Sequence, residues 1–233
     1  AGAMMMMDNS ITMDAIFGDG SERAKGGGFF GMLGSAAKRV ITGESLFMAS
    51  FTNTGMLKQK VSFAAPYPGK ILAMDLRNYR GKLICQKDSF LCCAKGISIG
   101  IEFTKKLGTG FFGGEGFILQ KLEGDGLAFI HAGGTIVKKS LNPGETIKID
   151  TGCLVAMTQN IQYDIQFVGG IKNAVFGGEG LFFATLTGPG EVWIQSLPFS
   201  KLASRVYSSA PQNMGRSVDE GSILGSIGNI FEK

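Results

Sequence analysis

The chain has 233 residues, of which 44% are hydrophobic and 18% are charged, so it is long enough to bury a large core in one or two domains. Its net charge of +4 is small and its Lys and Arg residues are dispersed, which argues against a nucleic-acid-binding protein. Glycine is the unusual residue, with 36 copies that mostly lie beside hydrophobic runs, and it predicts many tight turns rather than a disordered chain.

Membrane-spanning and secreted classes are also disfavoured by the sequence. No apolar run reaches the roughly 18–20 residues that are needed to cross a bilayer. Residues 1–7 lack a basic segment followed by a sustained apolar one, so they do not read as a signal peptide. The cysteines lack the spacing of a disulfide framework; they are Cys85, Cys92, Cys93 and Cys153. We therefore expect a cytoplasmic protein with reduced thiols.

Residues 1–25 are expected to form an N-terminal strand and a turn. Ser10 to Phe17 is short and apolar, and the Gly-Asp-Gly-Ser sequence that follows it breaks the strand. Residues 26–34, GGGFFGMLG, then read as a glycine-rich apolar loop. Its large side chains could contact lipid, a partner protein or stacked bases, or they could pack in the core or between subunits. This candidate interaction loop consists of Phe29, Phe30, Met32 and Leu33.

From residue 44 to about residue 200 the sequence reads as many short strands separated by turns. Residues 147–150 and 161–167 alternate strictly between apolar and polar side chains, which is typical of strands with one buried face. Helical spacing is almost absent from this stretch. Short, regularly spaced strands of this kind predict a β-sandwich, a barrel or a β-helix.

The C-terminal tail, residues 206–233, has a different pattern. Ser217 and Glu220 have the spacing of a helix capping box, and apolar residues with helical spacing follow them. Interspersed glycines weaken such a helix by about 1 kcal/mol each relative to alanine. The tail is therefore expected to be either frayed or a short helix, docked on its own core or in contact with another subunit or a membrane surface.

An internal repeat defines the organisation of the chain. The sequence FGGEG occupies residues 112–116 and recurs at residues 176–180, at an offset of 64, and a weaker copy precedes the first at an offset of 71. Repetition on this scale indicates one structural unit that is used several times. We expect one repeated all-β body over residues 26–205, with copies near residues 43–64, 112–134 and 176–198. The repeat indicates a scaffold built by duplication and names no reaction.

The repeated glutamates Glu44, Glu115 and Glu179 are the first candidate site residues. If the copies are related by a pseudo-rotation, the three carboxylates occupy equivalent places and could hold Ca²⁺ or Mg²⁺. The alternative is a turn position at which each glutamate caps backbone N–H groups or pairs with a basic side chain. The flanking glycines favour this alternative, because they suit a bulge. We therefore expect neither a metal site nor a cofactor.

Other enzyme motifs are weak. Residues 108–113 match G-x-G-x-x-G, but the following stretch reads as a strand, whereas a dinucleotide site needs a helix there. His131 is the only histidine, which argues against paired-His zinc sites, and no G-x-S-x-G elbow is present. His131 is better read as a strand-end residue. The adjacent Cys92 and Cys93 point to opposite faces of a strand and are expected to be buried and inert. We expect no catalytic residues and no enzyme.

Two blocks of sequence resemble a known family: FGGEGFILQKLEGDGLAFIHAGG at 112–134 and VGGIKNAVFGGEGLFFATLTGPG at 168–190. They are similar to bacterial proteins of unknown function related to the fungal altered-inheritance-of-mitochondria proteins. Further blocks extend the resemblance over about residues 10–205; they are residues 42–47, 66–69, 83–91 and 150–155.

The resemblance implies a duplicated double-stranded β-helix, related in fold to the tryptophan RNA-binding attenuation protein. It also implies ring-like assembly, with a trimer as the expected state. The fungal relatives are mitochondrial and are linked to inner-membrane organisation. The fold analogy transfers neither RNA binding nor tryptophan binding, because function resides in sites rather than folds. The family offers no established catalytic residues to carry over.

We therefore predict an all-β protein with a duplicated double-stranded β-helix or β-sandwich-like body. Its expected function is that of a non-catalytic scaffold that forms a homo-oligomer and binds an unidentified protein partner. Two alternatives remain open: a ring that binds a ligand or nucleic acid, and a membrane-associated organiser. Nucleic acid is the less expected ligand, and membrane contact would be peripheral.

Overall fold

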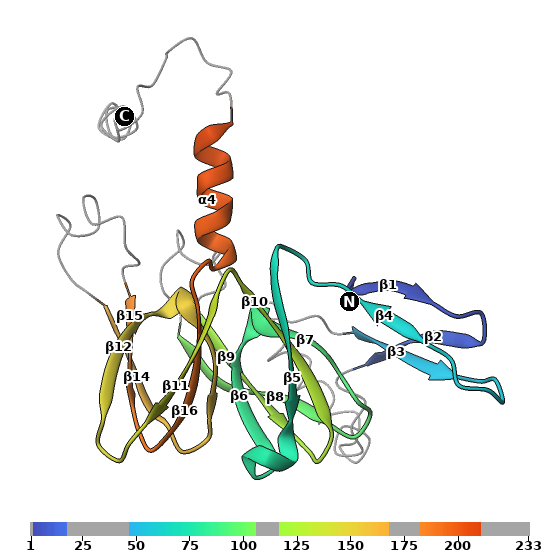
Figure 1. Ribbon diagram of the computed structural model, residues 1–233, viewed down its shortest axis with the longest axis horizontal. Helices are drawn as coiled ribbons and strands as arrows, with labels where there is room; N and C mark the ends of the chain where they lie inside the picture. Colours follow the sequence, from blue (N-terminus) through green and yellow to red (C-terminus); the bar gives the residue numbers. More distant parts are fainter. Residues whose placement is uncertain (1, 18–46, 106–116, 168–181, 211–233) are drawn as a thin grey trace. The chain divides into compact units, whose positions relative to one another are not determined.

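The computed structural model of the protein describes residues 2–17, 47–105, 117–167 and 182–210 (Figure 1). Most of these residues lie in β-strands, and the α-helix among them is α4 (Phe199–Ser209). The prediction of an all-β protein is confirmed, and none of the sheets that the described strands form closes on itself. By packing, the chain divides into two compact units, residues 1–202 and 203–233.

The N-terminal strands form two small antiparallel sheets. Strand β1 (Met4–Met7) pairs with β4 (Val61–Phe63), and β2 (Ile11–Phe17) pairs with β3 (Phe47–Asn53). The rings of Phe51 and Phe63 meet edge to face, with centroids 5.3 Å apart. Two-stranded sheets are only marginally stable by themselves. The N-terminal strands therefore depend on contacts beyond their own ladders.

The remaining strands form two copies of one six-stranded unit. The strands of the first half are β5 (Gly69–Asp75), β6 (Lys82–Gln86), β7 (Phe90–Cys93), β8 (Ser98–Lys105), β9 (Phe117–Glu123) and β10 (Leu127–Gly133). The strands of the second half are β11 (Ile136–Leu141), β12 (Thr146–Asp150), β13 (Leu154–Thr158), β14 (Gln162–Phe167), β15 (Phe182–Thr187) and β16 (Gly190–Gln195). In the first half the neighbours are β5-β10-β7 and β6-β9-β8, and in the second they are β11-β16-β13 and β12-β15-β14.

The register of the strand pairs repeats with the same offset that separates the two FGGEG sequences. Lys82 pairs with Glu123 between β6 and β9, and Thr146 pairs with Thr187 between β12 and β15. The β10–β7 and β16–β13 ladders correspond in the same way, down to a bulge at the same place in each. Residues related by this offset are therefore structural equivalents in these ladders. The weaker third copy, near residues 43–64, stays a prediction.

Short 3₁₀ turns repeat as well. Turn η2 (Lys87–Ser89) follows β6 and turn η4 (Thr151–Cys153) follows β12. The side chain of Gln86 accepts a hydrogen bond from the Asp88 N–H at 2.8 Å, and Asp150 accepts one from the Gly152 N–H at 2.9 Å. Gln86 and Asp150 are equivalents, so the same N-terminal cap forms with an amide in one half and a carboxylate in the other.

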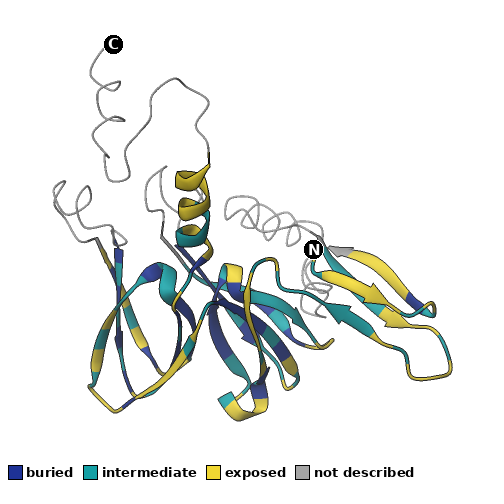
Figure 2. Cartoon of the chain, turned by 45° about the horizontal axis from the view of Figure 1, so that its top comes forward, coloured by how far each residue is buried: buried dark blue, intermediate teal, exposed yellow. Residues whose placement is uncertain are grey.

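Two hydrophobic cores hold the halves together (Figure 2). The first core is built mainly from the first half, but it also contains Val155, Ala156 and Trp193 of the second. The second core likewise takes Ile84, together with Phe117 and Leu119, from the first half. Strands β6 and β13 contribute to both cores. On β6 this follows because the side chains of a strand alternate between its two faces. The halves therefore share their interiors.

Candidate interaction site: a paired strand edge and its unpaired equivalents

The site residues predicted from sequence lie outside the described residues. This holds for the glutamates Glu44, Glu115 and Glu179 and for the loop residues Phe29, Phe30, Met32 and Leu33. Their roles stay predictions. Within the described ranges, no group of three or more His, Cys, Asp or Glu side chains is arranged to hold a metal ion. None of the described helices is both long enough and apolar enough to cross a membrane.

The two halves are joined by a strand pair, β13 with β6. The pairing is antiparallel, with Ala156 opposite Cys85, Met157 opposite Ile84 and Thr158 opposite Leu83. It fuses the sheet of one half with that of the other into a six-stranded sheet. Four residues of each strand are buried; Ile84 is 2% exposed and Cys85 is 0% exposed. This pair shows which strand the edge of β13, or of β6, binds. It therefore serves as the template for the equivalent strands of the other halves.

The equivalents of this pair, β7 and β12, are edge strands. Strand β7 is the equivalent of β13, and β12 is the equivalent of β6, but among the described strands nothing pairs with their outer edges. All residues of β7 are partly exposed, whereas the first four residues of β13 are buried. Strand β12 likewise has no buried residue, whereas β6 has four. In the described part of the chain, only these two edges lack a neighbour that their equivalents possess.

The apolar character of β7 is that of an interior strand. Its residues Phe90, Leu91 and Cys92 correspond to Leu154, Val155 and Ala156 of β13. Partly exposed apolar strands at a sheet edge offer both a hydrophobic surface and unpaired backbone groups to another chain. At the central position of β12, Lys148 stands in place of Ile84 of its equivalent. The β12 edge is therefore the more polar of the two.

Three cysteines lie on these strands: Cys85 on β6, and Cys92 and Cys93 on β7. Cys92 and Cys93 are partly exposed, so the prediction that both are buried is wrong. Burial raises the pKa of the Cys85 thiol, on the paired edge, to about 12. Burial also raises the pKa of Cys92, on the unpaired edge. Both are thus neutral thiols near pH 7 and act as small apolar side chains rather than as nucleophiles.

His131 and its equivalent Gln195 have different surroundings. Gln195 accepts a hydrogen bond from the Gly133 N–H at 2.8 Å and donates one to the Gly152 carbonyl at 2.9 Å. It thereby ties the end of β10 to turn η4. His131 is 1% exposed, and neither of its ring nitrogens has a hydrogen-bond partner among the described residues. The sequence predicted that His131 lies near the end of a strand, but it did not predict that the side chain is buried. The signal that the sequence offered was the equivalence of His131 to Gln195.

Aromatic rings cover His131. The ring of Tyr67 meets the imidazole edge to face at 4.3 Å, and Tyr67 also lies 5.2 Å from the ring of Phe199, the first residue of α4. Burial lowers the pKa of His131, and the backbone of Tyr67 opposes this without reaching hydrogen-bond geometry. Burial, and then the charge of Asp88, raises the pKa of Tyr67. The neutral imidazole is the form that this apolar site favours.

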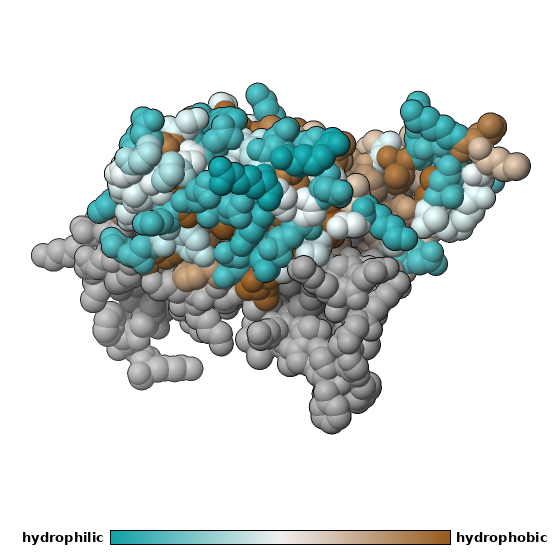
Figure 3. Space-filling view, turned by 90° about the horizontal axis from the view of Figure 1, so that it is seen from below, coloured by the Kyte–Doolittle hydropathy of each residue, from teal (hydrophilic) through white to brown (hydrophobic). Residues whose placement is uncertain are grey.

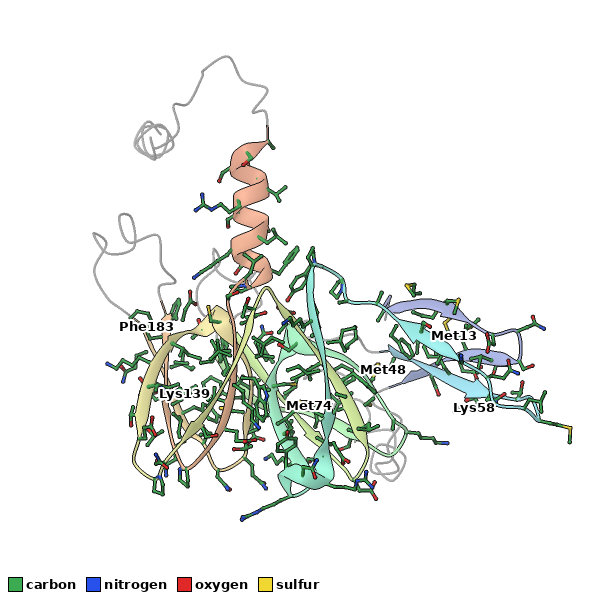
Figure 4. All side chains as sticks on the ribbon, viewed as in Figure 1. Met13, Met48, Lys58, Met74, Lys139 and Phe183 are labelled. Atoms are coloured by element: carbon green, nitrogen blue, oxygen red, sulfur yellow. The ribbon has the colours of Figure 1, made fainter. Side chains whose placement is uncertain are left out.

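The N-terminal strands carry exposed apolar side chains. All four methionines of β1 are exposed, Met5 to 66%. In the connection between β3 and β4, Met56 and Leu57 are exposed to 103% and 76%. Figure 3 shows hydrophobic residues (brown) at the surface of this region, and in Figure 4 Met13 and Lys58 project from it. Large apolar side chains that gather at a surface can mark an interaction site.

Comparison with known proteins places these features in a family. Residues 1–197 match the family described as Mitochondrial biogenesis AIM24. A protein of Streptococcus pyogenes serotype M6, described as uncharacterised, is 28% identical over 211 residues, which are 90% of this chain and 80% of the relative. The crystal structure of a Streptococcus pyogenes protein superposes with a TM-score of 0.67 at 25% identity, over 90% of this chain and 87% of that one. None of these comparisons assigns a reaction.

Proposed function

The chain belongs to the Mitochondrial biogenesis AIM24 family, and from this premise we propose that it is a non-catalytic scaffold that assembles from copies of itself. The observation that supports this most strongly is the contrast between β7 and its equivalent β13. Phe90, Leu91 and Cys92 are partly exposed, whereas the corresponding residues of β13 are buried against another strand. A strand with an interior sequence at an exposed edge is suited to bind a further strand.

The proposal extends to the form of the assembly. We expect a ring-like homo-oligomer, with a trimer as the expected state, built on a double-stranded β-helix related to the tryptophan RNA-binding attenuation protein. The repeated six-stranded unit supports a duplicated architecture of this kind. The cytoplasm is the proposed location, and the protonated thiols of Cys85 and Cys92 are compatible with it. No reaction is part of the proposal; the assembly would present its surface to an unidentified partner protein.

Native mass spectrometry of the full chain, at micromolar concentration and physiological salt, tests self-assembly. We expect one closed oligomer with the mass of a trimer. A monomer under these conditions would overturn the scaffold proposal. An oligomer that retains a stoichiometric small molecule after gentle purification would instead favour the alternative of a ligand-binding ring.

A membrane-associated organiser is the second candidate, and the connection between β3 and β4 favours it. Met56 and Leu57 are almost fully exposed, and Lys58 and Lys60 follow them directly. Apolar side chains at the tip of a connection can enter the lipid interface while adjacent lysines approach anionic headgroups. On this proposal, Met56→Ser combined with Leu57→Ser abolishes co-sedimentation with anionic vesicles. The control Val137→Ser removes an exposed apolar side chain elsewhere and should change nothing. Equal binding by both variants would contradict this function.

A further inference from the structure

We propose that copies of the chain join head to tail, with the outer edge of β7 in one copy pairing antiparallel to the outer edge of β12 in the next. This inference rests on the proposed self-assembly and adds which strands meet, in which direction and in which register. Strands β7 and β12 are the edges whose equivalents, β13 and β6, pair with each other inside the chain.

The other edges of the body do not offer such a template. Strands β5 and β11 are equivalents, and both lie at sheet edges. Strands β8 and β14 are likewise equivalents, and both are edges. In each of these pairs both strands are edge strands, so nothing in the described part of the molecule shows a strand bound at that edge. Among the described strands, only for β7 and β12 does one half of the chain display the bound state that the other half lacks.

The asymmetry of the internal contact gives the direction. A two-fold relation between the halves would pair β13 with β6 and, at the same time, β7 with β12. Of these two pairs, the described strands form only the first. The contact between halves is therefore heterologous, and each copy keeps one edge of either kind. Repeating the same contact between copies gives a chain of subunits that ends only when it closes into a ring.

The register follows from the offset between the two halves. Inside the chain Ala156 lies opposite Cys85 and Met157 lies opposite Ile84. The equivalent register between copies places Cys92 opposite Ile149. At the position next to Ile149, the contact between copies has Lys148 where the internal contact has Ile84.

The burial of the two edges fits this pairing. Leu91 is partly exposed, and its equivalent Val155 is packed in the core of the opposite half at 0% exposure. Pairing with a second copy would bury Leu91 as Val155 is buried. Lys148 can lay its aliphatic stem along such an interface and keep its ammonium group in water. The contact between copies is consequently weaker than the internal one.

A cysteine cross-link tests strand choice and register together. Residues directly opposite on antiparallel strands have Cα atoms about 4.5–5.5 Å apart, within the range that a disulfide spans. The variant Ile149→Cys keeps Cys92 and is oxidised mildly as the full-length protein. We expect covalent multimers on non-reducing gels, and mass spectrometry should find the peptides of residues 92 and 149 joined. Adding Cys92→Ser should remove these multimers.

The matched control is Val137→Cys, which places an exposed thiol on β11, an edge without a template. It should give no multimer linked through residue 137. If native mass spectrometry shows an oligomer but residues 92 and 149 of different copies are not joined, the head-to-tail inference fails and self-assembly stands. A monomer in native mass spectrometry overturns both. Unchanged thermal unfolding of the reduced variants confirms that the fold is intact in each case.

Discussion

Strand pair β13–β6 and the strands β7 and β12 are built to the same plan, and they differ in what lies beside them. Leu154 to Met157 on β13 are fully buried, while Phe90 to Cys93 on β7 are not. Both stretches are apolar throughout. The difference shows that burial is not a property of the strand sequence alone, because a strand becomes interior only when another strand covers its edge. A duplicated fold makes this visible, since one half serves as the reference for the other.

Introducing a charge at equivalent positions breaks this comparison most strongly. Val155→Asp places a carboxylate in the shared core, so we expect a loss of about 4 kcal/mol in the free energy of unfolding. Leu91→Asp alters an edge position, so the subunit should stay folded while the oligomer dissociates. Denaturant titration with light scattering measures both effects. Equal destabilisation by the two variants would mean that β7 is interior in every isolated copy.

Exchanging the residues at positions 84 and 148 sharpens the comparison. Ile84→Lys buries an ammonium group between the halves and should cost about 3 kcal/mol of stability. Lys148→Ile replaces a charge with the residue that the internal contact uses, so association between copies should tighten about tenfold, or about 1.4 kcal/mol. A dilution series of the oligomer measures this change in the association of Lys148→Ile. Weaker association of Lys148→Ile would show that β12 is not the β6-like edge.

Two equivalent glycines allow a smaller test of the repeat. A Cβ at Gly69 would overlap the Ala132 carbonyl oxygen, and a Cβ at Gly133 would overlap that of Leu197. Each Gly→Ala change should therefore cost about 2 kcal/mol, because backbone must move. Gly126→Ala is the control, since its Cβ would lie 3.4 Å from the nearest atom, at ordinary contact distance. Thermal unfolding of the three variants shows whether the two glycine positions are equally closely packed in the two halves.

The smallest expected effect concerns pH and the pair His131 and Gln195. Burial lowers the pKa of His131 from 6.5, so the unfolded chain binds the proton more readily than the folded one. The stabilising contribution is complete above the unfolded pKa and is lost as the pH falls below it. The free energy of unfolding should thus decrease as the pH is lowered from about 7 to about 5. His131→Gln, which installs the residue of the other half, should flatten this part of the profile; an unchanged profile would assign the loss to other groups.

Much of the fold could be predicted from the sequence, because its signals are local. The alternation over residues 147–150 and 161–167 predicted strands, and β12 and β14 lie there. Helix α4 was not predicted, although its apolar residues have the spacing of an amphipathic helix; they are Phe199, Leu202, Ala203, Val206 and Tyr207. The candidate residues of the FGGEG copies and of the loop at 29–33 lie outside the described residues, so their roles stay predictions.

The sequence alone determined that the chain is mostly β and that a repeat with a fixed offset runs through it, because periodicity and repetition can be read from neighbouring letters. Only the tertiary structure decided that β13 meets β6 while β7 and β12 stay at edges. It also decided that His131 is buried without a hydrogen-bond partner among the described residues, while Gln195 bridges two backbone groups. These are contacts between residues far apart in the chain. Two equivalent segments of like sequence can differ in them, because each depends on which distant strand the rest of the fold brings alongside.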